Sequence, residues 1–364
     1  MLGRGSASRR GSLLEGLEAG VLGFKVHEDM GAHLRSLDTC LDVADEYDVQ
    51  VAVHTDGLNE GLSVHDTLAV SSGRVFHAFH VEGCGGGHTP NVLQLAGVPH
   101  VIASSTNPTL PFGRDAVAEH FAMIFHAHAL RPDIASDVDI VRARVRAATM
   151  AGENVLHDRG VIPITSSDAQ GMGRAGETFR RTFQLASVLK PTEDADAGND
   201  NDRVLRYLAK LTVNPALAHG LSHEVGSLQP GKLADIVLWR YAAFASKPEM
   251  VIKGGLPAWG SVGDPGATVS VAQPLVIGPQ FGAHGASAAE LGVTFTNAAS
   301  EASAPGRRSV PVHGTRTVRG TDMLHHGVLG DVRVNAGGTQ VTLDGVPVDT
   351  EPLRYSTLTR RYLL

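Results

Sequence analysis

Short apolar runs alternate with helical stretches over the first part of the chain. Helical patterns such as 34–48 and 63–73 separate the runs, and the alternation predicts successive βα units around a parallel sheet from residue 12 to about 221. In α/β folds of this kind, barrels or doubly wound sheets, polar residues at the carboxyl ends of strands build the site. Five runs are rich in β-branched or aromatic residues and end in polar ones: 21–28, 49–56, 74–82, 100–107 and 161–169.

The pattern changes after residue 222. Segments 224–240 and 250–260 predict short strands punctuated by Gly and Pro, which indicates a small β domain. Residues 338–350 predict a hairpin with an Asp344-Gly345 turn. We expect a frayed start over 1–12, a short amphipathic helix over 13–20 and a solvated loop over 191–202. The predicted division is a barrel-type region at 1–221, a small β domain at 222–285 and a C-terminal mixed α/β segment at 286–364.

Composition and charge argue against several classes of function. The chain has 364 residues, a formal net charge of -7 and a pI near 6.2, which gives no basic surface for nucleic acid. The sequence has no run of 18 or more apolar residues and no Lys/Arg-rich helix, so neither of these signs of membrane contact is present. Cys40 and Cys84 are the only cysteines, so a disulfide scaffold is not expected and a cytoplasmic location is.

Histidines lie where the predicted strands end. Lys25 and His27 are two residues apart, so on a strand both side chains leave the same face. His54 and His80 each close an apolar run, and Asp168 follows another. Two imidazoles, a carboxylate and an inward lysine suit a borderline divalent metal such as zinc or nickel rather than magnesium or calcium.

A structural role is the alternative for each of these residues. A single histidine at a strand end is more often hydrogen-bonded than metal-bound, and an isolated aspartate in a loop usually caps a helix. Four such residues on four strands favour the metal site. His77 is three residues from His80, on the opposite face, and we interpret it as structural, like the following: His65, His100, His120, His219 and His223.

At this point the residues resemble a known family, the ureases, within the metal-dependent amidohydrolases. The resemblance implies an α/β fold: a (β/α)8 TIM-type amidohydrolase barrel, here incomplete and lacking its first strands, with a small β domain. It also implies hydrolysis of urea to ammonia and carbamate or carbon dioxide. Seven segments carry it, in family order: FKVHEDMGA, VAVHTDGLNE, FHVEGCGGGHTPN, SSTNPTLPF, TSSDAQGMGRAGE, NPALAHGLSHEVGS and GKLADIVLW.

The family's metal ligands match four residues of this chain. Lys25 resembles the lysine that carbon dioxide carbamylates and whose new carboxylate bridges two nickel ions. His54 and His80 are similar to two ligands of one nickel, and Asp168 to a ligand of the other. The implied cofactors are therefore two Ni²⁺ ions and carbon dioxide as lysine carbamate.

The resemblance also assigns residues around the substrate. His27 resembles the residue that hydrogen-bonds the urea carbonyl oxygen, with Gly85 and Gly171 near urea through backbone groups. Residues 113–131 resemble the mobile flap that closes over the site. Within it, His128 matches the general acid, with Asp29 and Arg144 as the residues that orient and tune it.

Two departures from the family pattern affect these expectations. Ureases carry an HxH ligand pair well upstream of the bridging lysine, and no histidine precedes Lys25 here. The HxH at His126 and His128 lies in the flap and does not replace that pair. Ala127 stands where the family usually has a cysteine, whereas Cys84 is interpreted as packing.

The missing pair keeps other functions open. The chain could be an inactive or complementation-dependent urease fragment, shortened at its N-terminal end. Another cyclic amidohydrolase, of dihydroorotase or hydantoinase type, is the third possibility, because it shares GKLADIVLW and the Lys, His, His, Asp order. For an active urease the resemblance implies small (beta and gamma) subunits, nickel-loading accessory proteins and a trimer of heteromeric units.

Overall fold

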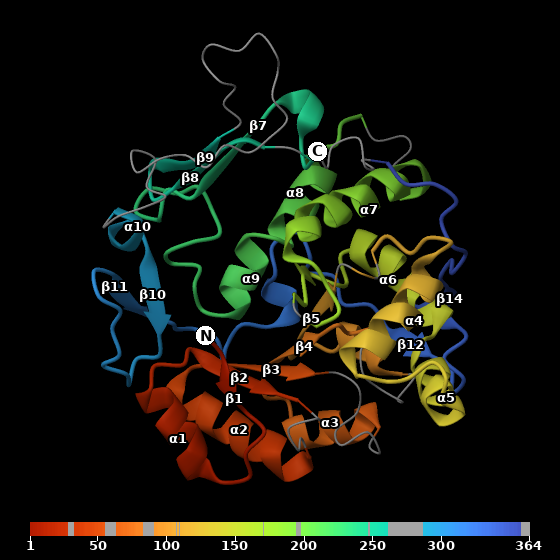
Figure 1. Cartoon of the computed structure of the whole chain (residues 1–364), viewed down its shortest axis with the longest axis horizontal. Helices are drawn as coiled ribbons and strands as arrows, with labels where there is room; N and C mark the ends of the chain where they lie inside the picture. Colours follow the sequence, from red (N-terminus) through yellow and green to blue (C-terminus); the bar gives the residue numbers. More distant parts are fainter. Residues whose placement is uncertain are drawn as a thin grey trace.

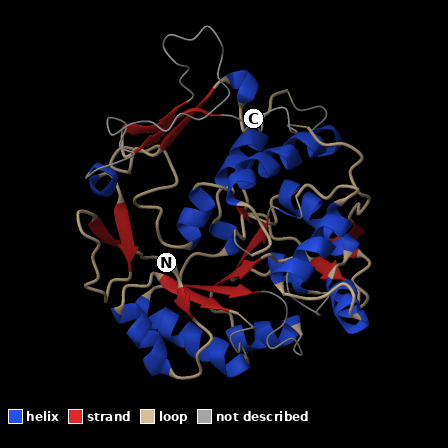
Figure 2. Ribbon diagram, in the orientation of Figure 1, coloured by secondary structure: helices blue, strands red, loops and turns tan. Residues whose placement is uncertain are grey.

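A parallel sheet forms the centre of the molecule. The computed structural model describes residues 1–27, 33–54, 63–82, 91–106, 108, 110–169, 171–193, 198–246, 248–260 and 287–357. Over these residues the largest sheet has six parallel strands in chain order (Figure 2). They are β1 Gly3–Arg4, β2 Gly23–Val26, β3 Gln50–His54, β4 Phe76–Phe79, β5 Val101–Thr106 and β6 Ile164–Ser166. The five predicted strands are confirmed as β2 to β6, and with them the α/β class and the partial barrel.

The register of the sheet separates an inner face from an outer one. Phe24, Val51 and Phe76 are lateral neighbours, and their side chains are buried against helices on the outer face (Figure 1). Lys25 and His77, each one residue further along, flank Ala52 in register and therefore face the other side. That inner face carries the candidate site.

Helices follow the strands, as the βα pattern predicts. In α2 the buried residues Leu37, Cys40, Leu41 and Ala44 recur at helical spacing and turn one face to the sheet. The α-helices are α1 Arg10–Glu18, α2 Leu34–Tyr47, α3 Val64–Ser71, α4 Ala116–Ala127, α5 Ala135–Arg144, α6 Ala147–Asp158, α7 Thr178–Glu193, α8 Asn201–Ala209, α9 Val213–Ala218 and α10 Ser287–Glu290. Short 3-10 helices are η3 Val92–Gly97, η5 Ala175–Glu177, η6 Tyr241–Ala243 and η8 Gly320–Asp322. In the described part of the chain, none of the helices has the length and apolar character to cross a membrane.

Two local predictions are wrong. The start of the chain is ordered, because β1 pairs with β2 and the hydroxyl of Ser6 holds the backbone of His27 from both sides, at 2.9 and 3.0 Å. The predicted loop over 191–202 begins too early, because α7 continues through Pro191 to Glu193. A proline there removes one hydrogen bond close to the helix end, where little of the ladder remains to be lost.

Small sheets account for the later strands. Strands β7 Ile236–Trp239, β8 Pro248–Lys253 and β9 Leu256–Gly260 form an antiparallel sheet inside the predicted small β domain. The predicted hairpin is confirmed, with Asp344 and Gly345 both at positive φ between β13 Val341–Leu343 and β14 Val346–Pro347. Strand β12 Val332–Val334 completes that sheet, and β10 Val293–Thr296 pairs with β11 Arg308–Pro311. The exact domain boundaries stay a prediction.

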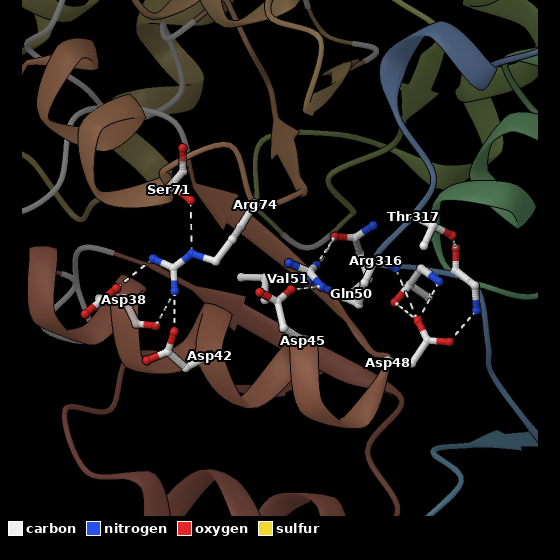
Figure 3. Close-up of polar contacts among 12 residues, drawn as sticks. Asp38, Asp42, Asp45, Asp48, Gln50, Val51, Ser71, Arg74, Arg316 and Thr317 are labelled. Atoms are coloured by element: carbon white, nitrogen blue, oxygen red, sulfur yellow. Dashed lines mark hydrogen bonds and ion pairs between the residues drawn. The ribbon is translucent and has the colours of Figure 1, made fainter.

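Residues 313–326, here called the C-terminal strap, cross the end of the sheet at which the strands begin, here called its lower end. Asp48, just before β3, accepts hydrogen bonds from the backbone N–H groups of Gly314, Thr315 and Arg316 (Figure 3). The buried guanidinium of Arg316 donates to Asp45 at 2.7 Å. Further along, the N–H of Gly320 reaches the carbonyl of Pro99, before β5, at 3.1 Å. The strap therefore ties the end of the chain to the barrel.

Replacing Asp48 with Asn should loosen this attachment. Asp48 has a φ of 49°, a conformation that asparagine tolerates, so the change removes charge without new backbone strain. Hydrogen bonds to a charged acceptor contribute about 1.5–3 kcal/mol each, and we expect the free energy of unfolding to fall by about 2–4 kcal/mol in urea denaturation. Asp42→Asn is the matched control, because Asp42 is an exposed residue paired with Arg74 on the surface. Equal losses in both variants would contradict the expectation.

Candidate metal centre

Four of the sequence-predicted residues meet at the carboxyl ends of β2, β3 and β4. The rings of His27 and His54 lie 4.0 Å apart, and those of His54 and His80 lie 4.1 Å apart. His80 Nε2 is 2.8 Å from His54 Nδ1, so two ring nitrogens converge on each other. Lys25 belongs to the same face as His27, two residues earlier on β2. The structure thus brings Lys25, His27, His54 and His80 together.

Lys25 is positioned by an aromatic neighbour. Its Nζ lies 4.2 Å from the centre of the Phe79 ring, a cation–π contact. The Phe79 ring in turn stacks against His77, with centroids 4.5 Å apart. Lys25 therefore points into the inner face of the sheet, as the alternation along FKVH predicts.

His80 is held in a conformation uncommon for a residue other than glycine. Its φ is 32°, its side chain is buried, and the next residue, Val81, donates its N–H to the carbonyl of Ser104 at 2.9 Å. Burial lowers the pKa of His80 well below the ordinary value, and repulsion from His54 and Lys25 lowers it further. The imidazole is therefore neutral at physiological pH, which is the form that binds a metal.

Asp168 shapes the loop that follows β6. It has a φ of 49°, and its carboxylate accepts a hydrogen bond from the N–H of Met172 at 3.3 Å. A Cβ on Gly171 would lie 3.1–3.3 Å from that carboxylate, so glycine lets the loop fold tightly around it. Burial and repulsion from Glu153 raise the pKa of Glu82, and a weaker repulsion from Asp168 adds to them.

The donor set can be tested against a metal. Two nitrogens that occupy adjacent positions on one ion, each at about 2.0–2.1 Å from it, are separated by about 3 Å, close to the 2.8 Å between His54 and His80. An ammonium cannot ligate a cation, so Lys25 fits only as a carbamate. Among the described residues, no group of three or more His, Cys, Asp or Glu side chains is arranged to hold an ion. Two imidazoles thus fit part of a borderline-metal site.

Sequence reasoning missed a buried pair of carboxyl groups beside this site. Glu82 and Glu153 are both buried, and Ser105 donates to Glu153. Burial, followed by repulsion from Glu153, raises the pKa of Glu82 well above its ordinary value, which favours the protonated form of Glu82. Glu82 stands within the FHVEG segment, but Glu153 comes from α6, and no local signal joins the two.

The predicted flap includes helix α4 and the general-acid candidate. His128 ends the helix, and its Nε2 lies 3.5 Å from Nη1 of the buried Arg144. The expected pairing of His128 with Arg144 is therefore present. A cavity of about 370 Å³ lies between α4 and the loop after Asp168, lined by Glu119, Ala122, Met123, His126, Gly171, Gly173 and Arg174. This places the predicted flap against the Asp168 loop.

Three of the remaining predicted residues lie in parts of the chain that the structure does not describe, whereas His77 lies in a described strand. Asp29, Gly85 and Cys84 lie outside the described residues. His77, interpreted as structural, has its Nδ1 3.0 Å from Nε2 of His219. Burial lowers the pKa of His219 to about 4. His77 lies on the inner face with Lys25, so the prediction that His77 faces away from His80 and the site is wrong. The alternation ends with β4 at Phe79, and His80 follows it with a φ of 32°.

Sequence comparisons show which known proteins this chain is similar to. The model of the amidohydrolase family matches residues 4–258. Urease subunit alpha 2 of Streptomyces coelicolor and urease subunit alpha 1 of Streptomyces avermitilis are each 59% identical over 369 residues, and the urease subunit alpha of Laribacter hongkongensis is 45% identical over 374. Each alignment covers 100% of this chain but 65–66% of the relative, so the chain spans about two thirds of their length.

These matches confirm the resemblance to urease alpha subunits, and the family implies a metal centre. The matched range includes β2 to β6 and every candidate ligand. The chain therefore belongs to the amidohydrolase family.

Proposed function

We propose that this chain is the catalytic part of a urease and hydrolyses urea to ammonia and carbamate at a two-nickel centre. The observation that carries the proposal is the convergence of His54 Nδ1 and His80 Nε2, 2.8 Å apart, beside Lys25 on the inner face. The names of the relatives, urease alpha subunits, support urea as the substrate.

In this proposal Lys25, as a carbamate formed with carbon dioxide, would hold the nickel ions together with His54, His80 and Asp168. The bound metal would supply Lewis-acid activation of the urea carbonyl and a lowered pKa of the attacking water. The neutral state of His80 makes its lone pair available for this role.

The other residues of the chain bind the substrate and move the proton. His27, whose backbone is fixed by Ser6, donates to the urea carbonyl oxygen. The backbone around Gly171 contacts the amide side of urea. His128 gives a proton to the leaving nitrogen, while Arg144 holds its ring in place. Closure of residues 113–131 over the site excludes bulk water.

We further propose that an HxH ligand pair of the kind that ureases carry completes the centre, because His54, His80 and Asp168 provide only part of the ligands that two metal ions need. The chain spans about two thirds of the length of its urease relatives. Small (beta and gamma) subunits, nickel-loading proteins and a cytoplasmic trimer of heteromeric units complete the proposed assembly; the word "subunit" in the relatives' names supports a complex.

The test is reconstitution with bound nickel and released ammonia as separate readouts. The chain is co-expressed with the unmatched third of the Streptomyces coelicolor subunit, the small subunits, accessory proteins, nickel and bicarbonate. We expect two nickel ions per chain and ammonia from urea, and fewer than two ions without the added segment. No nickel in the complete mixture would refute the metal centre. Two ions with turnover of a cyclic amide and not of urea would favour a different amidohydrolase.

A further inference from the structure

A cluster of basic side chains is buried where the C-terminal strap meets helices α6 and α8. Lys210 and His157 are completely buried, and His326 of the strap is 2% exposed. Lys210 Nζ donates a hydrogen bond to the carbonyl of Ile162 at 2.5 Å and lies 3.4 Å from His326 Nδ1. Such a group of like-charged residue types is unfavourable in the interior unless most of its members are neutral.

The contacts of His326 fit a neutral ring. Its Nε2 lies 2.9 Å from the carbonyl oxygen of Arg206, which can only accept, so Nε2 carries a hydrogen. In a neutral imidazole Nδ1 is then a lone pair, and Nδ1 lies 3.4 Å from Lys210 Nζ. A second proton on Nδ1 would add a positive charge to this buried cluster of basic groups, which is unfavourable.

Asp158, the carboxylate that acts on Lys210 as a counter-charge, is engaged by other side chains. On α6, Asp158 is already paired with Arg203 and accepts from Tyr207. On α8, Arg206 adds positive charge, and on the strap the neighbour of His326 is the exposed His325. Burial, then the nearby Lys210, lowers the pKa of His326 to about 2. The pKa of His157 is lowered well below its usual value by the same two causes in the same order.

We propose that the C-terminal strap is a pH-sensitive latch: acidification charges the histidine that the strap buries beside Lys210, and residues 313–326 leave the lower end of the barrel before the sheet opens. The latch is independent of the proposed urea hydrolysis, because its residues lie at the opposite end of the strands from the metal centre. Release would uncover Met323 and Val318, which pack against Ile102 and Ile164.

The direction in which pH changes the stability of the closed strap follows from the lowered pKa of His326. In the released strap His326 has its ordinary pKa near 6.5, whereas in the closed strap it is lowered. The contribution of His326 to the closed form is therefore fully present above pH 6.5 and is lost as the pH falls below it. One such histidine changes the opening equilibrium about tenfold between pH 7.5 and pH 5.5, and ionisation of Lys210 on release adds to the same trend.

Hydrogen exchange on the full chain tests the latch. The hydrogen-bonded amides of Gly314, Thr315, Arg316, Gly320 and Leu324 report on the strap, and those of β2 to β4 report on the sheet. After correction for intrinsic rates, we expect strap exchange to rise about tenfold or more from pH 7.5 to pH 5.5 while the sheet stays protected. Unchanged strap protection, or simultaneous exchange of strap and sheet, would overturn the proposal.

A pair of variants identifies the responsible residue. His326→Gln keeps a donor and an acceptor but cannot titrate, so the change in strap exchange between the two pH values should be about tenfold smaller than in the wild type, with the contribution of Lys210 left. His325→Gln, at the exposed neighbouring position, should behave as the wild type. An identical response in both variants would refute the assignment to His326. Should His326→Gln fail to fold, the wild-type pH series still decides whether the strap opens first.

Discussion

Replacing His80 with asparagine is expected to lower the nickel content of the reconstituted enzyme and to reduce ammonia release from urea by more than about 100-fold. Losing even a residue that only supports a metal ligand reduces affinity or activity by about 10- to 100-fold, so losing a ligand should cost more. Asparagine suits the test because His80 has a φ of 32°, which asparagine tolerates better than alanine does. Its amide does not reach the position of Nε2, the atom that faces His54.

The control for this variant is His65→Asn. His65 lies on α3 and is exposed, so its replacement should leave nickel content and activity unchanged. Circular dichroism of both variants shows whether the sheet is intact. A folded His80→Asn variant with full nickel content would show that His80 is not a ligand.

The candidate site was predictable where its residues obey the alternation of a strand. Lys25 and His27 share a face because they are two residues apart on β2, and the same rule places His54 with Ala52 on β3. Parallel order then brings the strand ends together without any further information. The strands themselves followed from apolar runs that end in polar residues.

Other parts of the site depend on contacts between distant segments. Glu82 meets Glu153 from α6, and His77 meets His219 after α9. The alternation of side chains along a strand indicates which residues share a face of that strand. It does not indicate which residue of a distant segment, here His219, contacts His77. Pairs of this kind have large separations in sequence and no spacing rule.

The C-terminal strap escaped prediction for the same reason. Its attachment depends on the carboxylate of Asp48, more than 200 residues earlier, which accepts backbone N–H groups that any residue could supply. The start of the chain is similar: a basic, Ser-rich segment suggests fraying, yet Gly3 and Arg4 pair with β2 through their backbone. Backbone hydrogen bonds of this sort leave little trace in composition.

Replacing Arg203 with methionine is expected to lower the free energy of unfolding by about 3–5 kcal/mol, because it leaves the Asp158 carboxylate as a buried charge without its cation. The side chains of Arg203 and Asp158 are 6% and 1% exposed, and the pair has two contacts, one of them 2.8 Å long. The methionine chain fills much of the same volume, so the loss reports on charge more than on packing. Urea denaturation measures it, with Arg333→Met as the control, since Arg333 pairs with Asp331 on the surface, their side chains being 71% and 55% exposed, and should contribute about 1 kcal/mol or less.

A double variant shows whether such a loss comes from the buried charge of Asp158 or from the hydrogen bond that Arg203 donates to Ala186. When Asp158→Asn is added to Arg203→Met, no buried charge is left, and Tyr207 can still donate to the remaining side-chain oxygen of residue 158. Replacing both partners of a buried pair is often close to neutral, whereas removing one is costly, so the double variant should recover at least half of the stability lost in Arg203→Met. If the double variant recovers none of that stability, the loss comes from the hydrogen bond that Arg203 donates to the carbonyl of Ala186 on α7, and not from the charge of Asp158.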